Sequence, residues 1–214
     1  MSIAQLVYPS HCMLCGAFIS DQQHGICPDC RRAAEKQMER SFLRPPRYVD
    51  ALVCAGSYAG GLGQAIRRMK FHSQRADIQP LTELMMTAWE MQQLPKPMLV
   101  TCVPISAARA HMRGFNQSAA LAQAIAAAWN IPFEETLRRH LLSRRQSELH
   151  AADRWKNAEK AYYARSRVDL TGKTVVLIDD VVTTGATASA CAMLLRDMGA
   201  QKVFLLAAAR AGGK

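Results

Sequence analysis

The stretch that most restricts the fold of this chain is residues 175–187, Val-Val-Leu-Ile-Asp-Asp-Val-Val-Thr-Thr-Gly-Ala-Thr. Its first four residues are apolar and include β-branched side chains, a pattern typical of a strand buried on both faces of a parallel sheet. Two adjacent acids, Asp179 and Asp180, follow this run directly. Because open α/β sheets bind ligands at the carboxyl ends of their strands, we expect these acids to lie in a binding site.

A short loop after the acids supplies a second kind of binding group. It contains glycine and hydroxyl side chains, and residues 188–195 beyond it predict a helix. The free N–H groups and the dipole at a helix N-terminus favour a phosphate. An acidic pair beside a phosphate cradle therefore indicates a sugar phosphate whose hydroxyls meet the acids. The loop residues are Thr183, Thr184, Gly185, Ala186 and Thr187.

The same stretch has two other interpretations. The first is an ordinary strand, loop and capped helix that binds no ligand. The second is a Walker A loop, because Gly172-Lys173-Thr174 supplies the ending of that motif. Arg167 stands where the first glycine of a Walker A loop is required, so this second interpretation is excluded.

The length of 214 residues suits one full domain with a small appendage. No apolar run approaches the roughly 20 residues that a membrane-spanning helix needs. Residues 1–10 lack the charged and long apolar regions of a signal peptide. We therefore expect a cytoplasmic protein without membrane insertion.

The formal net charge is +10, and much of the excess lies in arginine clusters. Such clusters attract polyphosphates or nucleic acid, although surface charge that keeps the protein soluble explains any single cluster equally well. No basic segment is interleaved with aromatic residues, which argues against a platform for stacking bases. The composition predicts weak and non-specific contact with nucleic acid.

A cluster of four cysteines lies near the N-terminus, in two C-x2-C pairs separated by eleven residues. Two such pairs allow four thiolates to converge on a tetrahedral ion, and a segment of about 30 residues cannot bury a core alone. Disulfides and a redox-active C-x-x-C are the alternatives, and a cytoplasmic setting disfavours disulfides. We predict a structural Zn²⁺ bound by Cys12, Cys15, Cys27 and Cys30.

The remaining sequence predicts strands that alternate with helices, as in a parallel or mixed α/β sheet. A glycine run at 60–63 is expected to turn the chain after the first strand, and residues 104–117 are expected to form a loop. Residues 144–155 are expected to form a mobile loop that passes into a helix. The predicted strands are 51–58, 98–103, 173–178 and 203–209, and the predicted helices include 31–40, 78–93 and one from Asn116 or Ser118 to Trp129.

The stretch 175–187 resembles the signature of type I phosphoribosyltransferases, which bind phosphoribosyl pyrophosphate (PRPP). Together with Arg113-Gly114-Phe115-Asn116-Gln117, Gln146-x-x-Leu149, Arg154-x-x-Asn157 and the four cysteines, the whole chain resembles the ComF/GntX family. The resemblance implies a phosphoribosyltransferase-like parallel sheet flanked by helices over residues 41–214, after a zinc-binding segment over residues 1–40. It also implies a link to competence, DNA uptake and the use of external DNA as a nutrient, with a partner in the uptake machinery.

The resemblance assigns roles to individual residues. Asp179 and Asp180 would bind the ribose hydroxyls, and residues 183–187 would bind the 5′-phosphate. Mg²⁺ would enter with PRPP, held mainly by substrate oxygens and water. The candidate cations on the pyrophosphate side are Arg109 and Arg113, after Pro104, and Arg144 and Arg145, in the segment that matches a flexible loop; for each, a solvated surface charge is the alternative.

Two differences from the phosphoribosyltransferase pattern restrict which substrate could accept the phosphoribosyl group. Thr183 stands where enzymes that act on 6-oxopurines carry an aspartate, so the resemblance disfavours hypoxanthine and guanine. Few residues follow the last predicted strand, so an acceptor-binding hood would have to come from residues 31–97. Two classes of function remain: a phosphoribosyltransferase, and a non-catalytic nucleotide-binding or DNA-handling factor, with a role in gluconate use as a further implication of the family name.

Overall fold

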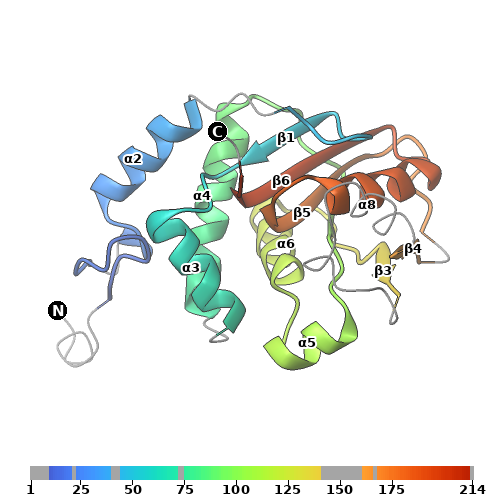
Figure 1. Ribbon diagram of the computed structural model, residues 1–214. Helices are drawn as coiled ribbons and strands as arrows, with labels where there is room; N and C mark the ends of the chain where they lie inside the picture. The colour runs from blue at the N-terminus through green and yellow to red at the C-terminus, as the bar shows by residue number, and fades with distance from the viewer. Residues whose placement is uncertain are drawn as a thin grey trace.

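The computed structural model describes residues 10–20, 23–39, 44–71, 75–140, 161–165 and 168–212. A four-stranded parallel sheet with the order β1-β6-β5-β2 forms its centre (Figure 1). A short antiparallel pair, β3 and β4, lies beside it. The strands are β1 Ala51–Cys54, β2 Leu99–Cys102, β3 Leu137–Arg139, β4 Tyr162–Ala164, β5 Thr174–Val182 and β6 Lys202–Arg210.

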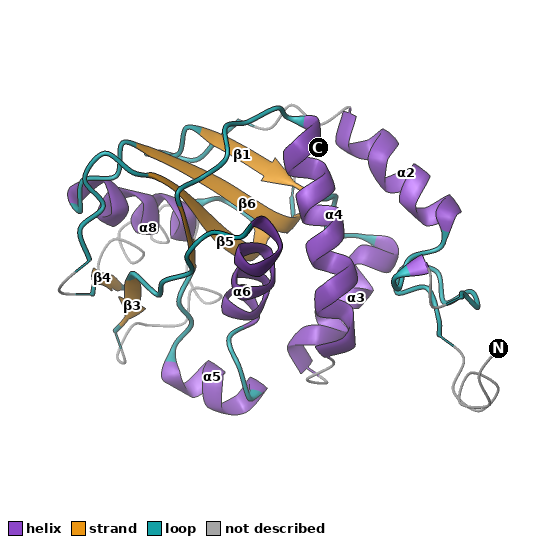
Figure 2. Ribbon diagram, turned by 180° about the vertical axis from the view of Figure 1, so that it is seen from behind, coloured by secondary structure: helices purple, strands orange, loops and turns teal. Residues whose placement is uncertain are grey.

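Helices cover both faces of the central sheet. Figures 1 and 2 show α8 on one face and α4 and α6 on the other. The helices are α2 Pro28–Glu39, α3 Gly60–Phe71, α4 Ile78–Met91, α5 Ala107–Arg113, α6 Gln117–Trp129 and α8 Ala186–Asp197, with a 3-10 turn at Arg75–Asp77. The predicted parallel sheet flanked by helices is confirmed.

Alternate residues of β5 enter two separate cores. Val176 and Ile178 pack with the side of the sheet that α4 and α6 cover, whereas Val175 and Leu177 pack with the α8 side. Successive side chains of a strand point to opposite faces, so a strand covered on both faces must be apolar throughout. This requirement explains the apolar run before Asp179.

Two local predictions were wrong, and one pair of strands was missed. The glycine run at 60–63 begins α3 instead of forming a turn, and Leu14 packs so closely against Gly61 that a side chain at this position would collide with the Leu14 carbonyl. Residues 107–113 form α5, which Ser106 caps by accepting a hydrogen bond from the Arg109 N–H. The pair β3 and β4 was not predicted, because three-residue strands carry almost no periodic signal.

The Ala-rich helix was predicted correctly. It runs from Gln117 to Trp129, and the Asn116 side chain caps it by accepting from the Ser118 N–H at 3.1 Å. Asn116 also donates to the Val103 carbonyl at 3.2 Å, just beyond β2. The cap therefore fixes the start of α6 against the C-terminal edge of the sheet.

The cysteine segment is attached to the core by a few polar contacts and by side chains of its own. Arg68 of α3 donates to the Met13 carbonyl at 2.8 Å and to the Asp77 carboxylate at 3.1 Å. Arg31 of α2 pairs with Glu83 of α4 at 3.1 Å. Met13 and Ile26 are buried in the same cluster as α4. The segment thus rests against α3 and α4, away from α8.

Candidate functional site

The two acids lie within β5, which continues past them to Val182. The sequence had suggested that they follow the strand, and Val181 and Val182 instead extend its pairing with β6. Asp179 is only 9% exposed. Both acids still lie in the second half of the strand, toward the edge of the sheet where α/β proteins bind ligands.

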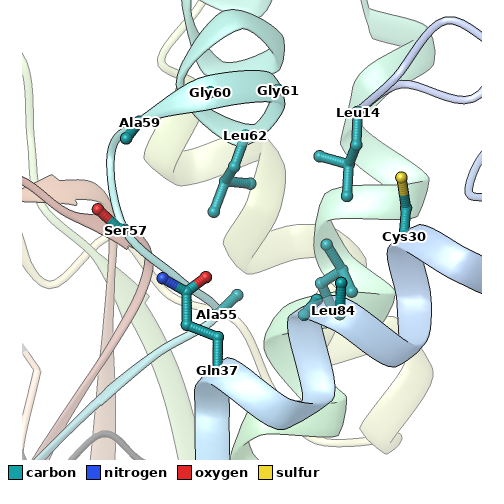
Figure 3. A pocket seen from close by; sticks show the side chains of 12 residues that line it. Leu14, Cys30, Gln37, Ala55, Ser57, Ala59, Gly60, Gly61, Leu62 and Leu84 are labelled. Carbon is teal, nitrogen blue, oxygen red and sulfur yellow. The ribbon is translucent and has the colours of Figure 1, made fainter.

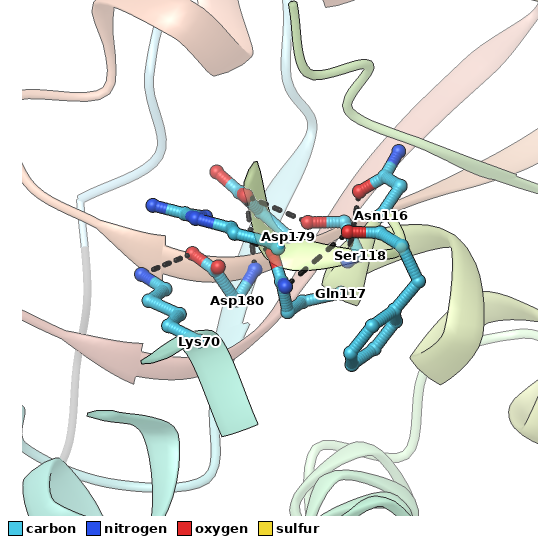
Figure 4. A network of polar contacts seen from close by, with 8 residues as sticks. Lys70, Asn116, Gln117, Ser118, Asp179 and Asp180 are labelled. Carbon is cyan, nitrogen blue, oxygen red and sulfur yellow. Dashed lines mark hydrogen bonds and ion pairs between the residues drawn. The ribbon is translucent and has the colours of Figure 1, made fainter. Parts of the chain in front are cut away.

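The two carboxylates have different partners (Figure 4). Asp180 pairs with Lys70 of α3 at 2.9 Å, and both side chains are largely buried. Asp179 accepts from the Ser118 hydroxyl at 3.2 Å and from the Asp180 N–H at 2.9 Å. The N-terminus of α6 thus holds one acid and the C-terminal end of α3 holds the other.

Burial raises the pKa of Asp179 to about 7, and the neighbouring charge of Asp180 adds to this rise. Lys70, the Asp180 N–H and the Ser118 hydroxyl act in the opposite direction. Near neutral pH the Asp179 carboxyl is therefore close to its titration midpoint. A ligand that donates hydrogen bonds to Asp179 would favour its ionised form.

A cavity of about 330 Å³, the acid-pair cavity, opens over Asp179 and Asp180. Arg109 and Arg113, which lie seventy residues before the acids, reach it from α5, and Lys70 reaches it from α3. Thr183 and Thr187 line it from the loop after β5. The structure therefore brings the two carboxylates together with cationic side chains and threonine hydroxyls from separate elements of the chain.

The loop after β5 has a backbone that only glycine adopts easily. Gly185 has φ = 78°, and a Cβ at this position would lie 2.8 Å from Pro46. Thr183 and Thr184 are exposed, and Thr187 lies in the first turn of α8. The loop thus presents hydroxyls and the N-terminus of α8, an arrangement that suits a phosphate.

Several residues of the cavity were not found from the sequence. Tyr162 of β4 is buried, burial raises its pKa to about 12, and Arg139 of β3 donates to its hydroxyl at 3.4 Å. Tyr58 lines the cavity next to the β1 end. Lys70 could have been suspected only as one of several cations in a basic helix, since nothing local links it to a strand more than a hundred residues away.

The sequence also missed a pairing of cations with aromatic rings beside this cavity. The Arg113 guanidinium lies 5.7 Å from the centre of the Phe71 ring, and that of Arg75 lies 5.0 Å from the Phe115 ring. Phe71 is 67% exposed. The basic and aromatic residues are distant in sequence, so no interleaved motif is visible there. The candidate cations Arg144 and Arg145 lie outside the described residues.

The donor set of the cavity fits Mg²⁺. Hard divalent cations take oxygen ligands, and Asp179 and Asp180 supply carboxylate oxygens beside open space for a ligand's phosphates. Asp180, which pairs with Lys70 at 2.9 Å, is the carboxylate that would hold such an ion once Lys70 moved toward the ligand's phosphates. Bound Mg²⁺ would neutralise phosphate charge, while Lys70 and the α5 arginines provide the remaining positive charge.

The four cysteines converge as predicted. Their sulfurs all lie within 4.8 Å of one another, and the Cys15 and Cys27 sulfurs are 3.8 Å apart. Tetrahedral Zn–S bonds of about 2.3 Å place sulfurs about 3.8 Å apart, so the spacing fits zinc. The Cys27 N–H donates to the Cys12 sulfur at 3.4 Å, and the Cys30 N–H to the Cys27 sulfur at 3.5 Å, as supporting contacts. Cys54, Cys102 and Cys191 are buried core residues.

Another cavity lies between the cysteine segment and α3 (Figure 3). It has a volume of about 370 Å³ and is mostly apolar, with Leu14, Leu62 and Leu84 among its lining residues. Gln37 of α2 and Ser57 supply polar atoms. Ser57 and Ala59 flank Tyr58, which lines the acid-pair cavity, so the two spaces lie on either side of one short segment.

Comparison with known proteins places this chain in a family. Residues 3–42 match the double zinc ribbon domain. The chain is 30% identical over 224 residues to the DNA utilization protein YhgH of Salmonella typhi, which covers 92% of this chain and 96% of that protein. The chain belongs to the YhgH and competence protein F family. Competence protein F of Haemophilus influenzae is 27% identical over 221 residues, covering 94% of this chain and 96% of that protein.

These relatives confirm the resemblance to ComF proteins, and the zinc ribbon match together with the converging cysteines confirms the N-terminal four-cysteine zinc site. Weaker similarities reach other proteins. Ribose-phosphate pyrophosphokinase of Pyrococcus abyssi is 42% identical over 40 residues, which are 19% of this chain and 14% of that protein. The glutamine PRPP amidotransferase of B. subtilis, complexed with ADP and GMP, is 23% identical with a TM-score of 0.40, covering 68% of this chain and 27% of that chain.

Among the described residues, none of the helices combines the length and the apolar character that crossing a bilayer requires.

Proposed function

We propose that this protein binds PRPP or a ribose 5-phosphate in the acid-pair cavity, as a phosphoribosyltransferase-like member of the family. One observation carries the proposal: Asp179 and Asp180 share a cavity of about 330 Å³ with Lys70, Arg109 and Arg113. Carboxylates accept from ribose hydroxyls, and the cations match a pyrophosphate. The combination suits a ligand that carries both groups.

Each end of such a ligand has a complementary wall. In this proposal the 5′-phosphate meets Thr183, Thr187 and the N-terminus of α8. The pyrophosphate meets Arg109 and Arg113 on α5, and the ribose hydroxyls meet the acids between these two walls. Lys70 leaves Asp180 or shares it with the ligand, so binding exchanges an internal ion pair for contacts to the substrate.

For phosphoribosyl transfer, the cavity residues would neutralise the departing pyrophosphate and exclude water. Mg²⁺ would supply further charge neutralisation when bound with PRPP, with Asp180 as its protein contact. Thr183 carries no carboxylate, and a threonine hydroxyl does not take up a proton near neutral pH. General acid–base help is worth roughly 10²–10⁴ in rate, so hypoxanthine and guanine are poor acceptors in this proposal.

The alternative is a non-catalytic PRPP or nucleotide sensor in the same cavity. The local similarity to a ribose-phosphate pyrophosphokinase supports a ribose phosphate ligand in either case. The names of the relatives, DNA utilization protein and competence protein F, support a role in using or taking up DNA. We place the protein in the cytoplasm, where PRPP is made.

Isothermal titration calorimetry with PRPP, ribose 5-phosphate, pyrophosphate and glucose 6-phosphate, each with and without Mg²⁺, tests the ligand class. We expect PRPP with Mg²⁺ to bind best and glucose 6-phosphate to bind weakest, because its hydroxyl arrangement differs from that of ribose. Equal affinity for all four ligands would overturn the proposal. A pyrophosphate-release assay with adenine, orotate, hypoxanthine, guanine and small amines then separates an enzyme from a sensor.

A further inference from the structure

We propose a second phosphate-binding site on the other side of the Thr183–Thr184 loop, lined by Arg44, Arg47 and Arg210. These residues surround a cavity of about 500 Å³ that the acid-pair site does not include. No carboxylate is among the described residues that line it. Three guanidinium groups around one space repel cations and leave anions as the matching ligand class.

Arg210 provides the second, independent observation. It is the last residue of β6 and pairs with Val182 of β5, so its backbone is fixed by the sheet. Its Nε is buried and lacks a hydrogen-bond partner among the described residues. A buried donor without an acceptor costs free energy, and the charge of an anion beside the Arg210 guanidinium, which lines the cavity, would offset part of that cost.

The remaining walls favour a phosphate group over a simple halide. Thr183 and Thr184 are exposed and offer hydroxyls on the same side as the arginines. Leu52 and Val182 form an apolar floor, which strengthens charge interactions nearby. The planar guanidinium fork matches the oxygens of phosphate in pairs.

The proposed site touches the acid-pair site at one loop. Thr183 is the one described residue that lines both cavities. Pro46, which lines the second cavity, lies against Gly185, where even a Cβ would approach to 2.8 Å. A phosphate held by Arg44 and Arg47 would therefore stiffen the loop that forms one wall of the acid-pair cavity. The two sites use different arginines, so they can be removed separately.

Calorimetry with inorganic pyrophosphate, without Mg²⁺, tests the proposal on the full-length protein. We expect the wild type to bind at two sites. Arg44→Gln/Arg47→Gln and, separately, Arg210→Gln should each weaken binding at the proposed second site about tenfold or more, because each variant removes charge-assisted hydrogen bonds to the phosphate. Arg109→Gln/Arg113→Gln should weaken pyrophosphate binding in the acid-pair cavity and leave binding at the proposed second site unchanged.

The control is Lys173→Gln/Lys202→Gln, which also removes two positive charges but at the opposite end of the strands. Lys173 directly precedes β5, and Lys202 is the first residue of β6. It should change neither affinity. A parallel titration with a thymidine oligonucleotide identifies the source of the phosphate: a loss confined to the oligonucleotide assigns the site to backbone phosphates, and a loss of pyrophosphate assigns it to a free ligand. Unchanged binding of both probes in the Arg44/Arg47 and Arg210 variants would overturn the proposal.

Discussion

The cysteine segment and the end of β5 are organised by opposite means. Cys12, Cys15, Cys27 and Cys30 are close in sequence, and their sulfurs meet within one short segment. The site at β5 draws Lys70, Arg109 and Asp180 from three elements that are far apart along the chain. One site is therefore held by a metal and the other by the packed sheet.

This contrast has a thermodynamic consequence. The sheet is buried on both faces and supplies its own stability. The cysteine segment has few buried side chains, and metal binding must contribute to its folding. Arg68 connects the two regions, because it holds the Met13 carbonyl while Lys70, two residues later on α3, holds Asp180. The comparison predicts that damage to the zinc site leaves the sheet folded.

The largest expected effect comes from loss of the metal. Cys15→Ser removes an exposed ligand without opening a cavity in the core. We expect zinc content to fall well below one per chain and the cysteine segment to lose several kcal/mol of stability, because structural zinc contributes its binding free energy to folding. Elemental analysis and hydrogen exchange measure the two effects.

Cys54→Ala is the control for this experiment, since Cys54 is buried in the sheet core. It should lower the melting temperature while keeping zinc. Full zinc content in Cys15→Ser, or equal protection of the segment with and without a chelator, would contradict the account.

The second-largest expected effect is the pH dependence of stability that buried Asp179 causes. The pKa of Asp179 is raised to about 7, so the folded protein binds a proton there that the unfolded chain releases at lower pH. The free energy of unfolding should therefore fall as pH rises from about 4 to about 7. In Asp179→Asn this contribution is absent, so the variant should gain roughly 2–4 kcal/mol relative to wild type across that range.

Denaturant unfolding of both proteins at about pH 5 and about pH 8 measures this difference. A constant offset between wild type and Asp179→Asn at the two pH values would show that Asp179 ionises normally.

A smaller effect is expected at the connection between the two regions. Arg68→Met removes the contact to the Met13 carbonyl and leaves the carboxylate of Asp77 buried without its partner. Breaking one side of a partly buried ion pair costs about 2–3 kcal/mol. Thermal unfolding should show this loss while zinc content stays normal. Arg32→Met, in an exposed pair with Asp29, is the control and should change little.

The smallest effect concerns nucleic acid. We expect single-stranded DNA to bind weakly, with a dissociation constant of about 10–100 µM that rises with salt. Phe71→Ala should weaken it by less than about fivefold, since only one exposed ring is lost. Fluorescence anisotropy at two salt concentrations measures the dissociation constant, its salt dependence and the effect of Phe71→Ala. Tight, sequence-selective binding that persists at high salt would reveal a reading element absent from this account.

The sequence predicts well what is local or periodic. The doubled C-x2-C, the apolar run before Asp179 and the Asn116 cap each occupy a few neighbouring residues, and each has the structure expected. The sequence does not predict which distant side chains meet. The contacts of Lys70 with Asp180, Arg139 with Tyr162 and Pro46 with Gly185 depend on how distant segments pack, and no local pattern encodes that packing.

The wrong local predictions have a physical reason as well. Glycines usually mark turns, yet Gly61 lies in the first turn of α3, where only glycine leaves room for the Leu14 carbonyl. The helix α5 has seven residues and a charged sequence, so its stability comes from the Ser106 cap and its surroundings, not from an apolar face.

The central claim, that the acid pair binds a sugar phosphate, is tested most directly by titrating PRPP with Mg²⁺ into wild type, Asp180→Asn and Asp197→Asn. Asp197 is an exposed acid at the far end of α8 and serves as the matched control. The account predicts that Asp180→Asn binds PRPP about 10- to 100-fold more weakly, while Asp197→Asn equals wild type. Equal PRPP affinity in all three proteins, or no binding by the wild type, would contradict it.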